Sequence, residues 1–147
     1  MKKILVLDTN VMSEMTRSVP DPAVAAWYLR QNSALLYTTS ITKAEMLYGV
    51  DLLPKGRRKP RLSEFARVGF EVELAGRVLA FDEAAAVHYA SIRGRKRRLG
   101  LGMSTLDAQI AAIVTAHDAV LVTRNTDDFE ECGIAVINPW TGEESKQ

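Results

Sequence analysis

The stretch Lys2-Lys3-Ile4-Leu5-Val6-Leu7-Asp8-Thr9-Asn10 passes abruptly from apolar residues to an acid, a hydroxyl and an amide. The apolar residues predict a buried strand. An acid directly after such a strand lies at its carboxyl end, which is the edge where open α/β sheets bind their ligands. Asp8 is therefore either a helix cap or part of a functional site.

The composition is that of one globular domain. The chain has 147 residues, of which 47% are hydrophobic and 25% charged, and its net charge is +1. No stretch reaches the roughly 18 uncharged apolar residues of a membrane span, and the apolar run over residues 4–7 is shorter than a signal peptide needs. We therefore expect a cytoplasmic protein with no membrane partner. The lone Cys132 agrees, because it excludes an internal disulfide.

Apolar runs alternate with segments of helical periodicity along the chain. We expect strands over residues 3–7, 35–39, 78–81, 119–122 and 135–137. We expect helices over residues 20–31, 42–53, 61–75, 82–99 and 105–117, a helical turn near 126–131 and an exposed connection over 55–60. This alternation predicts an α/β fold with a mainly parallel sheet covered on both faces, in one domain over residues 1–140. The polar residues 141–147 are expected to form a frayed tail.

Acidic residues stand at four junctions where a helix begins, three of them directly after a strand. The junctions are Asp8, the segment 40–45, the segment 104–107 and the segment 123–128. Three of them also have the spacing of a capping box, in the pairs Thr42 and Glu45, Ser104 and Asp107, and Asn125 and Asp128. Taken singly, each acid is more readily explained as a helix cap than as a ligand.

Taken together, the acids predict a metal site. Helix starts that follow parallel strands lie along one edge of the sheet, so Asp8, Glu45, Asp107 and an acid within 125–128 can converge. Packed carboxylates repel and raise one another's pKa unless a cation offsets their charge. Mg²⁺ prefers such oxygen ligands and keeps several waters. It can polarise a phosphodiester and lower the pKa of a bound water.

Two basic clusters complement these acids. One consists of Lys55, Arg57, Arg58, Lys59 and Arg61, and the other of Arg93, Arg95, Lys96, Arg97 and Arg98. Such clusters attract phosphate backbones, although either could equally be a solvated helix end. Acids for a metal and bases for phosphates together favour hydrolysis of a phosphodiester.

Four motifs in this order resemble PIN domains, and most closely the VapC-type toxins with their FitB-like members. They are Leu-Asp-Thr-Asn at 7–10, Ser-Ile-Thr-Lys-Ala-Glu at 40–45, Ser-Thr-Leu-Asp-Ala-Gln-Ile-Ala-Ala at 104–112 and Val-Thr-Arg-Asn-Thr-Asp-Asp-Phe at 122–129. The resemblance runs from residue 5 to residue 140. It implies an α/β/α sandwich and a Mg²⁺- or Mn²⁺-dependent endoribonuclease, a hydrolase that forms the toxin half of a type II toxin–antitoxin pair.

The resemblance also assigns roles to residues. It implies that the catalytic acids are Asp8, Glu45 and Asp107, with Asp8 and Asp107 as the most direct metal ligands. Glu45 would bind a metal or orient the attacking water. The supporting polar residues are Thr9, Asn10, Thr123 and Asn125.

One position departs from the family pattern. Many PIN domains place an Asp two residues after the threonine equivalent to Thr123, and this chain has Asn125 there. Asn contributes no charge, so Asp128 becomes the candidate for a fourth acid, ahead of Asp127. The departure favours catalysis with one metal ion over two.

The resemblance further implies partners. We expect an RNA substrate, a cognate antitoxin that blocks the acidic pocket, a homodimer, and operator DNA bound only through the antitoxin. The basic cluster at residues 93–98 would bind RNA or lie beside a subunit contact. The main alternative is a non-catalytic RNA- or DNA-binding regulatory module whose acids are only helix caps, and a DNA-directed nuclease is a third possibility.

Overall fold

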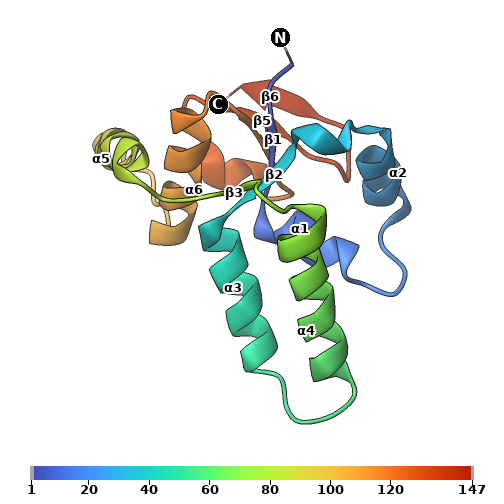
Figure 1. The fold of residues 1–147 in the computed structure, drawn as a ribbon. Coiled ribbons are helices and arrows are strands. Elements are labelled where there is room, and N and C mark those ends of the chain that lie inside the picture. Colours follow the sequence, from blue (N-terminus) through green and yellow to red (C-terminus); the bar gives the residue numbers. More distant parts are fainter. Residues whose placement is uncertain (1, 147) are drawn as a thin grey trace.

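Within residues 2–146, which the computed structural model describes, six strands form one sheet in the order β3-β2-β1-β4-β5-β6 (Figure 1). They are β1 (Leu5–Leu7), β2 (Leu36–Thr39), β3 (Val78–Leu79), β4 (Val120–Val122), β5 (Ala135–Ile137) and β6 (Glu144–Lys146). The first five pair in parallel, as the alternating pattern predicted. The chain builds outward from β1 to β2 and β3, then returns to the other side of β1 and continues through β4 and β5.

The C-terminal segment differs from the frayed tail expected from its polar sequence. Residues Glu144–Lys146 pair antiparallel with β5 as the edge strand β6. The turn between them is closed by backbone hydrogen bonds, including Asn138 N to Glu143 O at 2.9 Å and Gly142 N to Asn138 O at 2.8 Å. Backbone pairing needs no apolar side chain, so composition alone did not reveal this strand.

The helix over Thr9–Met15 was not predicted from the sequence, whereas the later helices follow the expectations with differences at their ends. The helices are α1 (Thr9–Met15), α2 (Pro22–Arg30), α3 (Ser40–Asp51), α4 (Arg58–Val68), α5 (Glu83–Arg98) and α6 (Thr105–Ala116). Shorter turns are η1 (Ser33–Leu35), the π-helical η2 (Gly69–Glu73) that continues α4, and η3 (Thr126–Phe129). The predicted connection over 55–60 was too long, because α4 begins at Arg58. Its Pro60 lies in the first helical turn, where proline costs no hydrogen bond.

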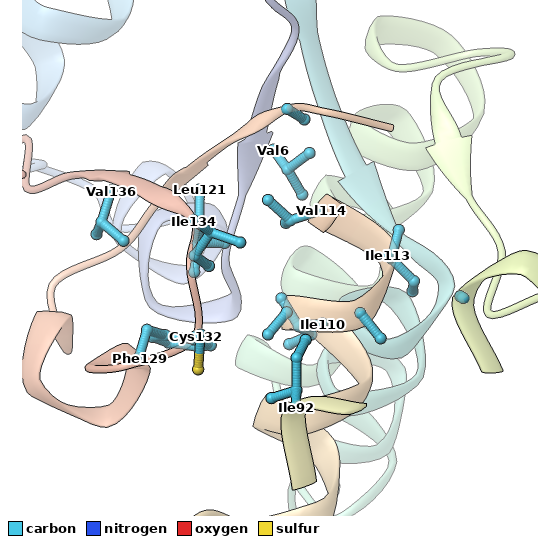
Figure 2. Close-up of a cluster of buried hydrophobic side chains, with 14 residues drawn as sticks. Val6, Ile92, Ile110, Ile113, Val114, Leu121, Phe129, Cys132, Ile134 and Val136 are labelled. Carbon is cyan, nitrogen blue, oxygen red and sulfur yellow. The ribbon is translucent and has the colours of Figure 1, made fainter. Parts of the chain in front are cut away.

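Helices cover both faces of the sheet, so the predicted α/β/α sandwich is confirmed (Figure 1). Successive side chains of β1 enter different layers, because side chains alternate along a strand. Val6 packs in a cluster with Ile110, Ile113 and Val114 of α6 (Figure 2), whereas Leu7 packs in a second cluster with Trp27 of α2. These two clusters fix the position of β1 and therefore of Asp8, which follows it.

Helices α3 and α4 lie side by side and project away from the sheet (Figure 1). This α3–α4 hairpin places the start of α3 next to the sheet and the start of α4 at the far end. None of the helices within residues 2–146 has the length and apolar character needed to cross a bilayer.

The helical layer on α6 can be tested by truncating one core side chain. Ile113 is 0% exposed, so Ile113→Ala should lower the free energy of unfolding by about 2–5 kcal/mol through lost burial and a cavity. Val87 on α5 is 67% exposed, and Val87→Ala should change it by less than about 0.5 kcal/mol. Urea unfolding of both variants measures this difference, and equal values would contradict the packing described.

Candidate active site

The sheet order creates a crevice between β1 and β4. The chain leaves β1 toward β2 and leaves β4 toward β5, on opposite sides, so the carboxyl ends of β1 and β4 mark a topological switch point. Open α/β sheets bind ligands at such points. Asp8 directly follows β1 and Thr123 directly follows β4, and Asp8 N donates to Val122 O at 2.9 Å. The two residues therefore meet where a ligand site is expected.

The Asp8 carboxylate serves both as a helix cap and as the centre of this crevice. Its Oδ1 accepts a hydrogen bond from Thr9 N at 2.8 Å as the N-cap of α1. Its Oδ2 accepts one from Thr123 Oγ1 at 2.8 Å. The residue is only 5% exposed, which is unusual for an acid whose only role is to cap the N-terminus of a helix.

Asn10 ties α1 to the turn after β4. Its Nδ2 donates to Thr123 Oγ1 at 3.1 Å and approaches Asp8 Oδ2 at 3.4 Å, while its Oδ1 accepts from Arg124 N at 3.1 Å. Thr123 Oγ1 also accepts from Asn125 N at 3.1 Å. Asn125 thus contributes its backbone N–H to this network. Its side chain forms no cap for η3, so the capping box predicted for Asn125 and Asp128 was wrong.

Glu45 reaches the site from the second turn of α3. Its Oε1 accepts a hydrogen bond from Thr9 Oγ1 at 2.8 Å, and Thr9 Oγ1 lies 3.2 Å from Thr42 Oγ1. The cap of α3 is Thr39, whose Oγ1 accepts from Thr42 N at 3.1 Å. The capping box predicted for Thr42 and Glu45 was therefore wrong. Glu45 is left free to belong to the site.

Asp107 lies half-buried in the first turn of α6, and its backbone N donates to Ser104 Oγ at 3.1 Å. The predicted cap at Ser104 is confirmed. Burial raises the pKa of the Asp107 carboxyl, the hydrogen bond with Ser104 lowers it, and the charges of Asp128 and Glu45 raise it again. The side chain thus experiences the negative charge of two other acids.

Two of the four acids, Asp8 and Asp107, have pKa values raised in part by the charges of neighbouring acids. Burial raises the pKa of Asp8 from 3.8 to about 6; hydrogen bonds from Thr123 and Thr9 oppose the shift, and the charges of Asp107 and Glu45 add to it. Asp128 acts on Asp107 in the same sense. The fold therefore brings Asp8, Glu45 of α3 and Asp107 of α6 within electrostatic reach of one another, with Asp128 of η3 acting on Asp107.

This donor set fits a hard divalent cation that keeps part of its water shell. Within residues 2–146, no group of three or more His, Cys, Asp or Glu side chains is arranged to surround a metal ion directly. Mg²⁺ usually binds through one or two carboxylates and retains several waters, so direct contact with all of the acids is not required. A bound cation would offset the negative charge of these acids and so relieve their mutual repulsion.

The basic cluster on α5 is partly engaged by the protein itself. Lys96 is 3% exposed and donates from Nζ to Glu130 O at 2.9 Å, so its burial removes it from the predicted RNA-binding residues. Arg95 pairs with Glu131 at 2.7 Å, and Arg93 donates to Met103 O. Arg97 and Arg98 remain exposed. The sequence of this cluster therefore overstated the number of basic side chains that are free to bind RNA.

A groove of about 890 Å³ opens beside the acids, between α1, α3 and α4, and is named here the α3–α4 groove. Its lining includes Thr9, Asn10 and Glu45. At its rim the Arg124 guanidinium lies 5.0 Å from the centre of the Trp140 ring. The sequence reasoning did not single out Arg124 and Trp140. The only signal was the position of Arg124 immediately after Thr123.

Acids gathered at the switch point of a parallel sheet are expected of a nuclease that works with a divalent cation. The chain belongs to the PIN domain family, whose model matches residues 5–134.

Two relatives and one solved structure illustrate this membership. The VapC ribonuclease Y4jK of Sinorhizobium fredii is 39% identical over 93% of this chain and 98% of its own length. Toxin FitB of Neisseria gonorrhoeae is 38% identical over 93% of this chain and 99% of its own. The structure of FitAB bound to an IR36 DNA fragment matches with a TM-score of 0.87 and 39% identity, over 93% of this chain and 96% of that chain. The FitB-like resemblance of the four motifs is thereby confirmed.

The raised pKa of Asp8 predicts a pH dependence of stability in the absence of metal. The pKa is higher in the folded than in the unfolded state, so the stabilisation is complete below about pH 4 and is lost as the pH rises through 6. A shift of about two units corresponds to about 3 kcal/mol. In EDTA, the free energy of unfolding of the wild type relative to Asp8→Asn should fall by that amount between pH 4 and 7. Parallel curves from urea titrations would contradict the burial of an ionisable Asp8.

Proposed function

We propose that this chain is a divalent-metal-dependent endoribonuclease and the toxin of a type II toxin–antitoxin pair. The observation that carries the proposal is the buried Asp8 carboxylate at the switch point, with Glu45 and Asp107 close enough to raise its pKa. Such an arrangement disfavours the metal-free ionised state and is suited to a bound cation. The similarity to a VapC ribonuclease and to toxin FitB supports the choice of RNA and the toxin role.

Asp8 and Asp107 are the residues proposed to hold the cation, which we take to be Mg²⁺ or Mn²⁺. When bound, the cation would polarise the scissile phosphodiester and lower the pKa of a water. The Thr123 and Thr9 hydrogen bonds hold both oxygens of Asp8 in fixed directions. Asp107 is oriented by the first turn of α6, which Ser104 caps.

Glu45 is proposed to orient and deprotonate the attacking water. Thr9 anchors one of its oxygens at 2.8 Å, and the other can accept a hydrogen bond from water. Thr9 is next to Asp8 in the chain, so the same turn positions both acids. Thr9, Asn10 and Thr123 act here as positioning residues.

The residues Asn125 and Asp128, at the fourth position of the pocket, favour one metal ion over two. Asn125 contributes its backbone N–H to Thr123 and adds no negative charge. Asp128 supplies negative charge on the Asp107 side of the pocket. Asp8 with Glu45 and Asp107, and with Asp128 on the Asp107 side, matches the charge needed for one partly hydrated cation better than for two.

The proposed partners follow from the toxin role. They are an RNA substrate, a cognate antitoxin that covers the acidic pocket, a second copy of this chain in a homodimer, and operator DNA bound through the antitoxin. The FitAB structure, in which a related toxin–antitoxin complex holds a DNA fragment, supports this set.

The function is tested by removing one charge from the pocket. Asp107→Asn should lower metal-dependent cleavage of total RNA by about 100-fold or more while the thermal midpoint stays within a few degrees, because Asn keeps the shape of the side chain. EDTA should abolish cleavage by the wild type. The matched control is Asp127→Asn, which removes an exposed charge from the neighbouring turn and should leave the rate unchanged.

Two outcomes would contradict the proposal. Wild-type cleavage by correctly folded Asp107→Asn would show that the site is assigned wrongly. Salt-sensitive RNA binding with no cleavage in Mg²⁺ or Mn²⁺ would favour the alternative module, in which Asp8 and Ser104 act only as the caps they also are.

A further inference from the structure

The α3–α4 groove runs from Glu45, the member of the acidic pocket that lines it, to the tip of the α3–α4 hairpin. Its α3 wall runs from Glu45, near the sheet, through Gly49 to Leu53 at the end of the helix. Figure 1 shows that α4 runs back toward the sheet. Arg58 and Arg61, in the first turns of α4, also line the groove. The groove therefore joins Glu45 to a basic end. Its lining also includes apolar side chains such as Met46, Val50 and Leu62.

The two arginines at the far end are available to bind a ligand. Arg58 and Arg61 are exposed, and neither takes part in an ion pair within residues 2–146. The Arg61 guanidinium lies 5.6 Å from the centre of the Phe65 ring, a contact that positions it without neutralising its charge. Arg17, which also lines the groove, is instead paired with Glu14 at 3.2 Å.

Arg58 and Arg61 do not stabilise α4, so helix stability does not explain why arginines occupy these positions. The first turn of α4 holds no acid, and its N-cap Arg57 forms no side-chain cap. Basic residues at a helix N-terminus oppose the helix dipole and so destabilise the helix slightly. Their position along a groove that also reaches Glu45 points instead to a negatively charged ligand.

The second basic cluster lacks these features. On α5, Lys96 is buried against Glu130 and Arg95 is paired with Glu131. Only Arg97 and Arg98 are exposed without such a partner, and neither lines the α3–α4 groove. The composition of the two basic clusters did not show which of them contacts RNA. These contacts favour the cluster at the start of α4.

We propose that the α3–α4 groove is the track along which a single RNA strand reaches the acids, and that Arg58 and Arg61 are phosphate contacts that set substrate affinity. The inference rests on the ribonuclease function proposed above. The groove volume of about 890 Å³ is that of a cleft that holds a small ligand, which matches a few nucleotides of one strand. Exposed Gly49 leaves its wall open, because a Cβ added there meets no atom within 4 Å.

The first experiment compares two double variants that remove the same charge. Arg58→Ala with Arg61→Ala should raise KM for a single-stranded RNA by about tenfold and leave kcat within about twofold. The slope of log affinity against log salt should fall by about 1.4, since each phosphate contact to a single strand contributes about 0.7. Arg97→Ala with Arg98→Ala should change neither quantity. Equal effects of the two pairs would overturn the proposal.

The second experiment adds a charge without removing a contact. Gly49→Glu should raise KM several-fold more than Gly49→Gln, which has the same shape without the charge. Both variants should fold, because the position is open. Equal KM values for the two would overturn the proposal. The proposal would also be overturned if the Arg58→Ala, Arg61→Ala double variant kept its KM but bound the antitoxin more weakly. The groove would then be a binding site for the protein partner.

Binding measured without catalysis separates this inference from the proposed function. All variants are titrated with fluorescein-labelled single-stranded RNA in EDTA, where no cleavage occurs. If the wild type fails to cut RNA but the arginine pair weakens binding, the groove is supported and the ribonuclease function fails. If the wild type and the Arg58→Ala, Arg61→Ala double variant bind and cut RNA equally well, the ribonuclease function is supported and the groove is not the path of the RNA.

Discussion

The site depends on one hydrogen bond between two strand ends. Asp8 follows β1 and Thr123 follows β4, and the 2.8 Å bond between them closes the crevice at the switch point. The two core clusters hold β1 from both faces, so the carboxylate has little freedom to move away from its neighbours. The burial that results raises the pKa of Asp8 and creates the need for a cation.

Much of the pocket could be predicted from the sequence because the fold and the motifs agree. An apolar run ending in Asp8 marks both a strand and the edge where ligands bind. The helix that carries Glu45 follows from apolar periodicity, and the helix start that carries Asp107 follows from the Ser104 cap as well. What could not be predicted is how each acid divides its role between cap and site. Thr39 caps α3 and releases Glu45, whereas Asp8 does both.

Other features escaped prediction for physical reasons. The strand order depends on long-range packing, so the switch point became visible only in the structure. The burial of Lys96 depends on a carbonyl supplied by the distant η3 segment, and no local pattern records that contact. The edge strand β6 rests on backbone pairing with β5. Charge runs and polar tails are therefore the least informative parts of this sequence, while acids at strand ends are the most informative.

The central claim is that the pocket is an acidic site that a divalent cation completes. It is tested most directly by NMR titration of the Asp8 carboxyl carbon with and without Mg²⁺. In the metal-free protein the pKa of Asp8 should be about 6, and saturating Mg²⁺ should move it below about 4, because the cation favours the ionised form. A pKa near 4 without metal, or one that Mg²⁺ and Mn²⁺ leave unchanged, would contradict the claim.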